Sequence, residues 1–311
     1  MQANRPNIIA SKPPSYLRIV VTTRCTLACP FCHLEGDPAQ SGAAQGLAAE
    51  EIAELAGAAY DQGVRKIKLL GGEPLARQDI GRVIALLRQR CTDADLSLIT
   101  AGVVNLANLQ AAFDAGLDRA NLSIHGWSPD RLAKHTRVRD AHARRQAVLE
   151  FLLRIGRPLK CNYVYTGPEV EEDLAQFLAW AAGKPLVVAL LDDLGNPAMG
   201  PATVKEALRR LRGPWGSMER DNDPHSLSTL RLGWSDGLAV EIKDQQLGQV
   251  APWRACTGCL QREQCREGIH AVRLKHDGTA APCMDRPDLG RRVVGLRSND
   301  LAMQWQSVLA A

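Results

Sequence analysis

The sequence lacks a hydrophobic run long enough to cross a lipid bilayer. A spanning helix needs about 20 consecutive apolar residues, whereas PLVVALL at 185–191 is among the longest apolar runs here and is typical of a buried strand. The N-terminal stretch MQANRPNIIASKPPSYLRIV also lacks the apolar core and small-residue cleavage site of a signal peptide. We therefore expect a cytoplasmic protein without a membrane partner.

The chain also lacks a strong excess of either charge, an internal repeat and any low-complexity tract. Its 311 residues include 38 Lys and Arg against 34 Asp and Glu, which gives a net charge of +4. This mild excess agrees with anionic ligands but does not indicate a nucleic-acid-binding protein. With 45% hydrophobic residues, the chain is long and apolar enough to bury a large core.

Cysteine is present in two close groups. The stretch TRCTLACPFCH has C-x3-C-x2-C spacing, formed by Cys25, Cys29 and Cys32. A second group near the C-terminus consists of Cys256, Cys259, Cys265 and Cys283. In a reducing cytosol such spacings favour metal binding over disulfide bonds. The isolated Cys91 and Cys161 are expected to be buried in the core.

Between the two cysteine groups, strand and helix patterns alternate. Short apolar runs predict six strands, at 16–22, 65–70, 96–100, 119–124, 159–165 and 185–191. Helical spacing predicts helices at 47–63, 76–90, 105–116, 141–156 and 170–183. This alternation predicts an α/β barrel or partial barrel built from right-handed βαβ units. Chemistry in such a barrel lies at the C-terminal ends of the strands, and the first cysteine group follows the first strand.

Three cysteines in one short loop are compatible with two kinds of metal centre. A structural zinc ion needs four ligands, which His33 or a distant cysteine would complete. A [4Fe–4S] cube anchored by three thiolates keeps one iron open. The turn GGEP at 71–74 alone is typical of a tight strand-to-helix connection, although paired glycines also let a backbone approach a ligand closely.

The cysteine spacing, the aromatic Phe31 before the third cysteine and the GGEP turn together resemble the radical S-adenosylmethionine (SAM) enzymes, over about residues 16–190. The resemblance implies a partial (β/α)6 TIM-like barrel with a SAM-binding [4Fe–4S] cluster on the first cysteine group. It implies reductive cleavage of SAM to a 5′-deoxyadenosyl radical that takes a hydrogen atom from the substrate. An electron donor such as flavodoxin or ferredoxin would be a partner. The implied SAM contacts are Phe31, Gly71, Gly72, Glu73, Thr100 and Ser123.

Within that superfamily, YLRIVVTTRC, KIKLLGGEPLARQDI and LKCNYV resemble the GTP 3′,8-cyclase family of molybdenum-cofactor synthesis. This resemblance places Lys160 at the SAM carboxylate or the substrate. It also implies basic residues that hold a triphosphate or assist catalysis, namely Arg18, Lys66, Lys68 and Arg273. His125, in SIHGWSPD, is a candidate for proton transfer, and Trp127 either stacks on a base or packs in the core.

The second cysteine group resembles auxiliary-cluster regions. CTGC with AVRLKHDGTAAPC is similar to the cyclase region, and C-x2-C-x5-C is similar to the SPASM domains of peptide-modifying radical SAM enzymes. Four cysteine ligands would saturate a second [4Fe–4S] cluster, whereas three would leave one iron open; a four-thiolate zinc site also fits the spacing. We favour an iron–sulfur cluster and four ligands.

Departures from the cyclase pattern indicate a different substrate. Ala189 and Ala271 stand where that family has arginines, and the chain ends WQSVLAA without a glycine-rich tail. Lys66 and Lys68 share one strand face, and burying two lysines there favours an anionic substrate. We expect a radical SAM enzyme for a small anionic molecule, such as a nucleotide or nucleoside of a specialised pathway. A SPASM-type peptide maturase ranks lower, because such enzymes commonly carry a separate N-terminal peptide-binding domain and only about fifteen residues precede the first strand here. A non-catalytic iron–sulfur redox sensor is the third alternative.

The last third of the chain is expected to form an extension. We place the barrel in residues 1–192 and the extension, with the second cluster, in residues 193–311. The extension should contain a helix at 202–212, a mobile polar segment to 226, and hairpins at 230–243 and 271–283.

Overall fold

The computed structural model describes residues 8–9, 15–33, 46–221, 228–244, 250–251, 253–260, 265 and 270–310. In these ranges, every helix is too short or too polar to cross a membrane.

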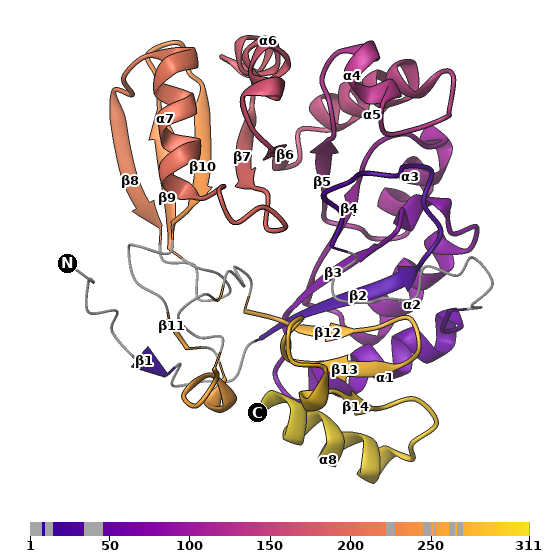
Figure 1. Cartoon of the computed structure of the whole chain (residues 1–311). Helices are drawn as coiled ribbons and strands as arrows, with labels where there is room; N and C mark the ends of the chain where they lie inside the picture. The colour runs from indigo at the N-terminus through magenta and orange to yellow at the C-terminus, as the bar shows by residue number, and fades with distance from the viewer. Residues whose placement is uncertain are drawn as a thin grey trace.

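Six parallel strands form the central part of the fold. They are β2 (Tyr16–Thr22), β3 (Lys66–Gly71), β4 (Asp95–Thr100), β5 (Arg119–Ile124), β6 (Leu159–Tyr165) and β7 (Leu186–Asp192). They lie side by side in chain order, as an open arc with helices along its outer side (Figure 1). The six strands predicted from the sequence are confirmed, and the partial barrel is confirmed as an arc that does not close.

The helices that follow these strands cover the outer face. They are α1 (Ala49–Asp61), α2 (Ile80–Arg90), α3 (Leu106–Asp114), α4 (Pro129–Ala133), α5 (Ala141–Arg154) and α6 (Glu171–Ala181). The short α4 was not predicted, and the helix expected from residue 76 begins later because Pro74–Ala76 forms a 3₁₀ turn. Cys91 and Cys161 are fully buried in the core, as predicted.

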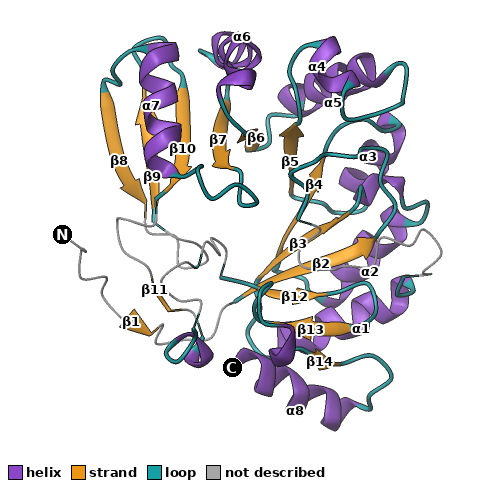
Figure 2. Ribbon diagram, in the orientation of Figure 1, coloured by secondary structure: helices purple, strands orange, loops and turns teal. Residues whose placement is uncertain are grey.

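Six further strands extend the sheet at both edges. They are β8 (Ser217–Asp221), β9 (Thr229–Gly233), β10 (Ala239–Lys243), β12 (Val272–Leu274), β13 (Thr279–Ala281) and β14 (Arg291–Arg292). The same part of the chain contains the helices α7 (Pro201–Arg212) and α8 (Ser298–Leu309). β10 pairs in parallel with β7, and β12 pairs in parallel with β2. The result is one sheet with the order β14-β13-β12-β2-β3-β4-β5-β6-β7-β10-β9-β8 (Figure 2). A separate small sheet joins β1 (Ile8–Ile9) to β11 (Val250–Ala251).

Both predicted hairpins are confirmed, but the segment before the first of them differs from the prediction. β9 pairs antiparallel with β10, and β12 with β13. Ser217–Asp221, expected within a mobile polar segment, is instead the edge strand β8, antiparallel to β9. All five of its residues are exposed. An edge strand of this kind buries no apolar face, so its residues carry no hydrophobic alternation.

Alternation along the strands gives the sheet two different faces. Leu17 and Ile19 of β2 are buried in the core, so Arg18 between them points to the opposite, inner face. The strand register then aligns a row of inner-face residues across β12, β2, β3, β4 and β5, formed by Arg273, Arg18, Lys68, Ser97 and Arg119. The inner face is therefore polar and rich in cations.

Candidate active site

The three cysteines of the first group lie on one loop directly after β2. Cys25 and Cys32 are exposed and Cys29 is partly exposed. The loop is tied to the segment after α4: the Ala28 amide donates to the His135 carbonyl at 2.8 Å, and the Thr136 hydroxyl donates to the Thr26 carbonyl at 2.7 Å. These bonds fix the loop independently of any bound group.

The donor chemistry of this loop fits a three-cysteine iron–sulfur cluster. Burial, with the neighbouring Cys25 and Cys32, raises the pKa of the Cys29 thiol to about 12. A thiol binds metal only as thiolate, so assembly of a cluster here must release the proton. Three thiols that reach the surface from one anchored loop satisfy both the ligand count and the access that assembly requires.

The GGEP turn is held directly against the base of the cysteine loop. The Gly72 amide donates to the Thr22 carbonyl at 2.8 Å, and the Glu73 amide donates to the Arg24 carbonyl at 2.7 Å. A Cβ atom on Gly71 would lie 2.1 Å from the Thr22 carbonyl oxygen, and one on Gly72 would lie 2.2 Å from the Arg24 carbonyl oxygen. From the sequence, the paired glycines are expected to let the backbone approach a ligand closely. The structure shows that they also let the turn pack against the backbone of the cysteine loop.

Glu73 connects this turn to the end of β4. Its buried carboxylate accepts the Leu75 amide at 3.1 Å, the Ala101 amide at 2.8 Å and a hydrogen bond from Thr100. Burial raises the pKa of Glu73 to about 7, although these three hydrogen bonds lower it. A carboxylate accepts about four hydrogen bonds, so Glu73 retains capacity for one further donor.

Phe31 and His125 lie together beside the cysteine loop. Their ring centroids are 5.4 Å apart, and the His135 ring contacts Phe31 from another side at 5.7 Å. Burial, aided by His135 and Arg145, lowers the pKa of His125 to about 4. His125 is therefore neutral at neutral pH. Ser123, four residues after Arg119 on β5, lies on the same inner face, in register with Asn162 of β6.

The loop after β5 is anchored from two sides by residues that sequence reasoning did not identify. Asp173 of α6 accepts the Trp127 amide at 2.6 Å, the Ser128 amide at 2.8 Å and the Tyr163 hydroxyl at 3.0 Å. The fully buried Arg145 donates to the carbonyls of Gly126 and Trp127.

Trp127 belongs to the packing of the barrel. Its ring lies 4.7 Å from Trp180 and 5.3 Å from Phe177, centroid to centroid. The core-packing alternative for Trp127 is confirmed.

Replacing Asp173 by Asn should destabilise the protein by about 2 kcal/mol at pH 7, because an amide nitrogen would face donors that now bond to a charged acceptor. Burial raises the pKa of Asp173, but the bonds from Trp127 and Ser128 outweigh it, and the net shift is downward. The stabilisation is therefore complete above the unfolded pKa of about 3.9 and is lost as pH falls through the folded pKa.

Urea unfolding of wild type and Asp173→Asn at pH 7 and pH 3 measures this effect. The difference between the two proteins should shrink at the lower pH. The exposed Asp130 on α4 provides the control Asp130→Asn, which should change little at either pH. Equal losses at both pH values would contradict a role for the charge.

The predicted substrate residues gather on the inner face. The side chains of Arg18, Lys68 and Arg273 are buried there, and Lys66 lies with its Nζ 4.7 Å from the centre of the Tyr16 ring. Burial and the nearby charges of Arg18, Arg119, Lys66 and Lys160 hold the pKa of Lys68 well below its usual range. Such a concentration of cations favours binding of an anion.

Lys160, by contrast, is engaged by a residue from the extension. Its Nζ forms an ion pair with Glu241 of β10. Arg231 of β9 approaches the other oxygen of Glu241 at 3.9 Å. Sequence reasoning missed Glu241, although a lone carboxylate between Val240 and Ile242 signals a residue that faces away from the core.

The second cysteine group surrounds one cavity. Cys256, Cys259, Cys265 and Cys283 all line it, together with Trp253 and Arg286. The cavity brings together cysteines from the 3₁₀ turn at Arg254–Cys256 and from the end of β13. The donor set of four thiols fits the cluster expected from the sequence.

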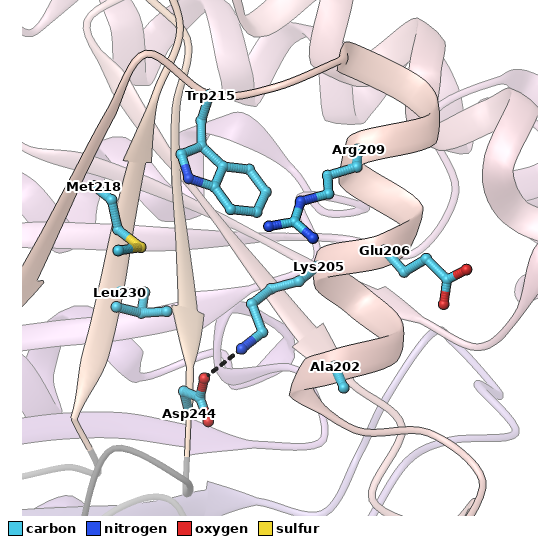
Figure 3. Close-up of a pocket in the computed structure, with 8 residues that line it drawn as sticks. All are labelled: Ala202, Lys205, Glu206, Arg209, Trp215, Met218, Leu230 and Asp244. Carbon is cyan, nitrogen blue, oxygen red and sulfur yellow. Dashed lines mark hydrogen bonds and ion pairs between the residues drawn. The ribbon is translucent and has the colours of Figure 1, made fainter.

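A larger cavity of about 670 Å³ lies elsewhere, between α7 and the strands β8 to β10. Figure 3 shows Trp215, Arg209 and the ion pair of Lys205 with Asp244 around it. It lies on the outer face, because Leu230 in its wall belongs to the core cluster, so the sheet separates it from the inner-face cations. This cavity is therefore separate from the cysteine loop and from the basic residues of the inner face.

The fold and the three-cysteine loop define a class of enzyme. The family description "Radical SAM superfamily" matches residues 19–181, and the chain belongs to this superfamily. It is thus a radical SAM enzyme.

Within this superfamily, the chain is similar to proteins named GTP 3′,8-cyclase. A probable GTP 3′,8-cyclase of Methanopyrus kandleri is 32% identical over 276 residues, covering 87% of this chain and 81% of the relative. A probable GTP 3′,8-cyclase of Metallosphaera sedula is 34% identical over 300 residues, covering 94% and 88%.

Solved structures support the fold. The structure of SuiB from Streptococcus suis bound to its precursor peptide SuiA matches with a TM-score of 0.62 at 16% identity, covering 94% of this chain. This chain spans only 65% of the SuiB chain. The enzyme anSMEcpe with bound AdoMet matches with a TM-score of 0.54 at 14% identity, covering 86% of this chain and 74% of that one.

Proposed function

We propose that this enzyme reductively cleaves SAM and uses the radical to remove a hydrogen atom from a small anionic substrate, of the nucleotide or nucleoside class. The cluster would supply one electron that breaks the C5′–S bond of SAM, giving methionine and a 5′-deoxyadenosyl radical. The observation that carries the proposal is the contact between the GGEP turn and the three-cysteine loop, through the Gly72 and Glu73 amides. This contact would hold the loop that binds the cluster next to the carboxylate that binds the SAM ammonium group.

The chain's own residues would bind and orient SAM. Cys25, Cys29 and Cys32 would hold the cluster, leaving one iron for the ligand. The remaining acceptor capacity of Glu73 would bind the SAM ammonium group, while the Thr100 side chain hydrogen-bonds the same carboxylate. Ser123 offers a hydroxyl on the inner face of β5, and Phe31 would shield the cluster side of the site from water.

The substrate would bind on the inner face beside this unit. Arg18, Lys68 and Arg273 place basic side chains on this face, where an anionic group of the substrate can pair with them. The relatives named GTP 3′,8-cyclase support a nucleotide or nucleoside as the substrate class. His125, neutral at neutral pH, would be the proton acceptor nearest the cysteine loop.

The four C-terminal cysteines would hold a second [4Fe–4S] cluster. Their arrangement around one cavity supports four ligands, because Cys265 lines it together with the other three. Four thiolates saturate a cubane, so this cluster would transfer electrons and would not bind the substrate.

Release of 5′-deoxyadenosine after anaerobic reduction tests the proposed cleavage. Reconstituted wild-type protein with SAM and dithionite should release it, and a Cys25→Ala/Cys29→Ala/Cys32→Ala variant should release none. Chromatography with mass detection measures the nucleoside. A reconstituted protein that binds iron but yields no 5′-deoxyadenosine, with or without nucleotides added, would instead support the redox-sensor alternative.

A further inference from the structure

Trp253 has a buried indole N–H without an acceptor. The side chain is 3% exposed, and its Nε1 atom has no hydrogen-bond partner in the part of the chain that the structure describes. An indole nitrogen can only donate a hydrogen bond, and a buried donor without an acceptor destabilises the fold. The Trp253 N–H therefore needs an acceptor that the described residues do not supply.

The Trp253 side chain borders the cavity of the second cysteine group. Cys256, Cys259, Cys265 and Cys283 line the same cavity, and Trp253 directly precedes the 3₁₀ turn that carries Cys256. The sulfur atoms of an iron–sulfur cluster accept hydrogen bonds. A cluster held by these cysteines would therefore bring acceptors to the residue that lacks one.

Arg286 supplies a second donor, from the segment that follows Cys283. Its side chain hydrogen-bonds the Cys259 sulfur. The Asp288 carboxylate accepts from Nε at 2.7 Å and from Nη2 at 2.6 Å, which orients the guanidinium and leaves its other N–H groups for the sulfur. Asp288 offsets the charge of Arg286, and Asp285 also lines the cavity. Arg286 therefore acts on the cysteine through a hydrogen bond and not through net positive charge.

Hydrogen bonds to cluster sulfur stabilise the two oxidation states unequally. Reduction adds one electron and makes the sulfur atoms more electron-rich, so a donor stabilises the reduced state more than the oxidised state. The reduction potential of the cluster rises accordingly. Apart from the cysteines, the cavity is lined by Ala255, Leu289, Asp285, Trp253 and Arg286, and of these five only the last two have side-chain N–H groups.

We propose that Trp253 and Arg286 raise the reduction potential of the second cluster by donating hydrogen bonds to its sulfur. Trp253 donates to a sulfide or thiolate in the cavity, and Arg286 donates to the Cys259 thiolate. The step that they favour is uptake of one electron by the cluster from the reductant, which loses that electron; both donors keep their protons, and no bond is made or broken. This inference rests on the proposed function, in which these cysteines hold a second cluster.

Redox titration followed by electron paramagnetic resonance measures this potential in the reconstituted holoenzyme. The Cys25→Ala/Cys29→Ala/Cys32→Ala variant, titrated in the same way, identifies the signal of the second cluster. Trp253→Phe should weaken the electron affinity of that cluster about tenfold, the effect of one hydrogen bond, which is a downward shift of about 59 mV for one electron.

Trp305→Phe is the matched control for this variant. Trp305 on α8 also has a buried Nε1 atom without a partner among the described residues, but it does not line the cysteine cavity. Its removal should change the electron affinity of the second cluster less than about twofold, because it donates nothing to the cluster.

Variants of Arg286 test the second donor. Arg286→Met removes the N–H groups and should also lower the electron affinity about tenfold, whereas Arg286→Lys keeps a charged donor and should recover part of that loss. Arg292→Met is the control: it removes an exposed arginine of β14 that lies outside the cavity lining, and should change the affinity less than about twofold.

A measurement on the wild type does not depend on the folding of any variant. With ¹⁵N-labelled tryptophan, the reduced second cluster should show hyperfine coupling to an indole nitrogen, which Trp253→Phe loses and Trp305→Phe keeps. A wild type without this coupling would overturn the role of Trp253. Iron analysis and thermal unfolding confirm that each variant is loaded and folded.

The inference fails if Trp253→Phe and Trp305→Phe shift the potential equally, if neither Trp253→Phe nor Arg286→Met shifts it, or if the cysteines hold zinc. Measuring 5′-deoxyadenosine release on the same samples separates this inference from the proposed function. Release by a wild type whose second site holds zinc would overturn the role of the two donors and leave SAM cleavage intact. The expected shifts in potential without any release would support the two donors and overturn the proposed cleavage.

Discussion

Gly72→Ala should remove the SAM-cleaving activity while the protein stays folded. The added Cβ would lie 2.2 Å from the Arg24 carbonyl oxygen and 2.6 Å from its carbonyl carbon. Because both atoms are backbone, the strain is relieved only if the GGEP turn moves away from the cysteine loop or the residue that precedes Cys25 moves. A displacement of about 1 Å at a reacting centre costs about a hundredfold in rate, so 5′-deoxyadenosine release should fall by at least that factor.

Iron content of the same variant tests whether the displaced loop still anchors a cluster. Reconstituted Gly72→Ala should hold about four fewer irons per chain than wild type, since a misplaced loop cannot anchor a cubane. Gly200→Ala is the matched control: this glycine before α7 has extended backbone and nothing within 4 Å of the added Cβ. A Gly72→Ala protein with full iron and activity within threefold of wild type would show that the turn does not support the cysteine loop.

Removing the first cysteine group should halve the iron of the reconstituted enzyme. Wild type should bind about eight irons with matching sulfide, and Cys25→Ala/Cys29→Ala/Cys32→Ala should retain about four. The reason is physical separation: the second group lines a cavity of its own, formed by residues that follow β11 in the chain. Elemental analysis with a sulfide assay on anaerobic protein gives both values.

A complementary pair of variants completes this experiment. Cys256→Ala/Cys259→Ala should lose the other four irons, and Cys91→Ala, which removes a buried core thiol, should lose none. If wild type instead contains about four irons and one zinc ion, the C-terminal cysteines form a structural zinc site. The proposal of a second iron–sulfur cluster would then be wrong, whereas the proposal of a cluster on Cys25, Cys29 and Cys32 would stand.

The barrel strands were predictable from sequence because each has apolar residues at the alternate positions that face the core. Leu17, Ile19 and Val21 of β2 all enter the core, and the strands that follow repeat this pattern with short connections. The position of the cysteine loop followed from the same reasoning, since the end of a first barrel strand is a fixed place in the fold.

Other features depend on contacts that no local pattern encodes. β8 has no buried residue and exists because β9 offers it a partner. The pair of Lys160 with Glu241 joins residues 81 positions apart, so neither residue alone predicts it. The close approach of Gly72 to Arg24 likewise depends on how two loops meet, although the motif containing Gly72 was recognised.

The pairing of β12 with β2 has a consequence for synthesis of the chain. β2 ends at Thr22, whereas its neighbour β12 ends at Leu274. Because a chain folds as it emerges from the ribosome, one edge of β2 stays open until almost the entire chain has been made. Open strand edges are templates for wrong pairing. The nascent enzyme therefore has this open strand edge through most of translation, and premature termination before residue 272 should yield products that depend on chaperones.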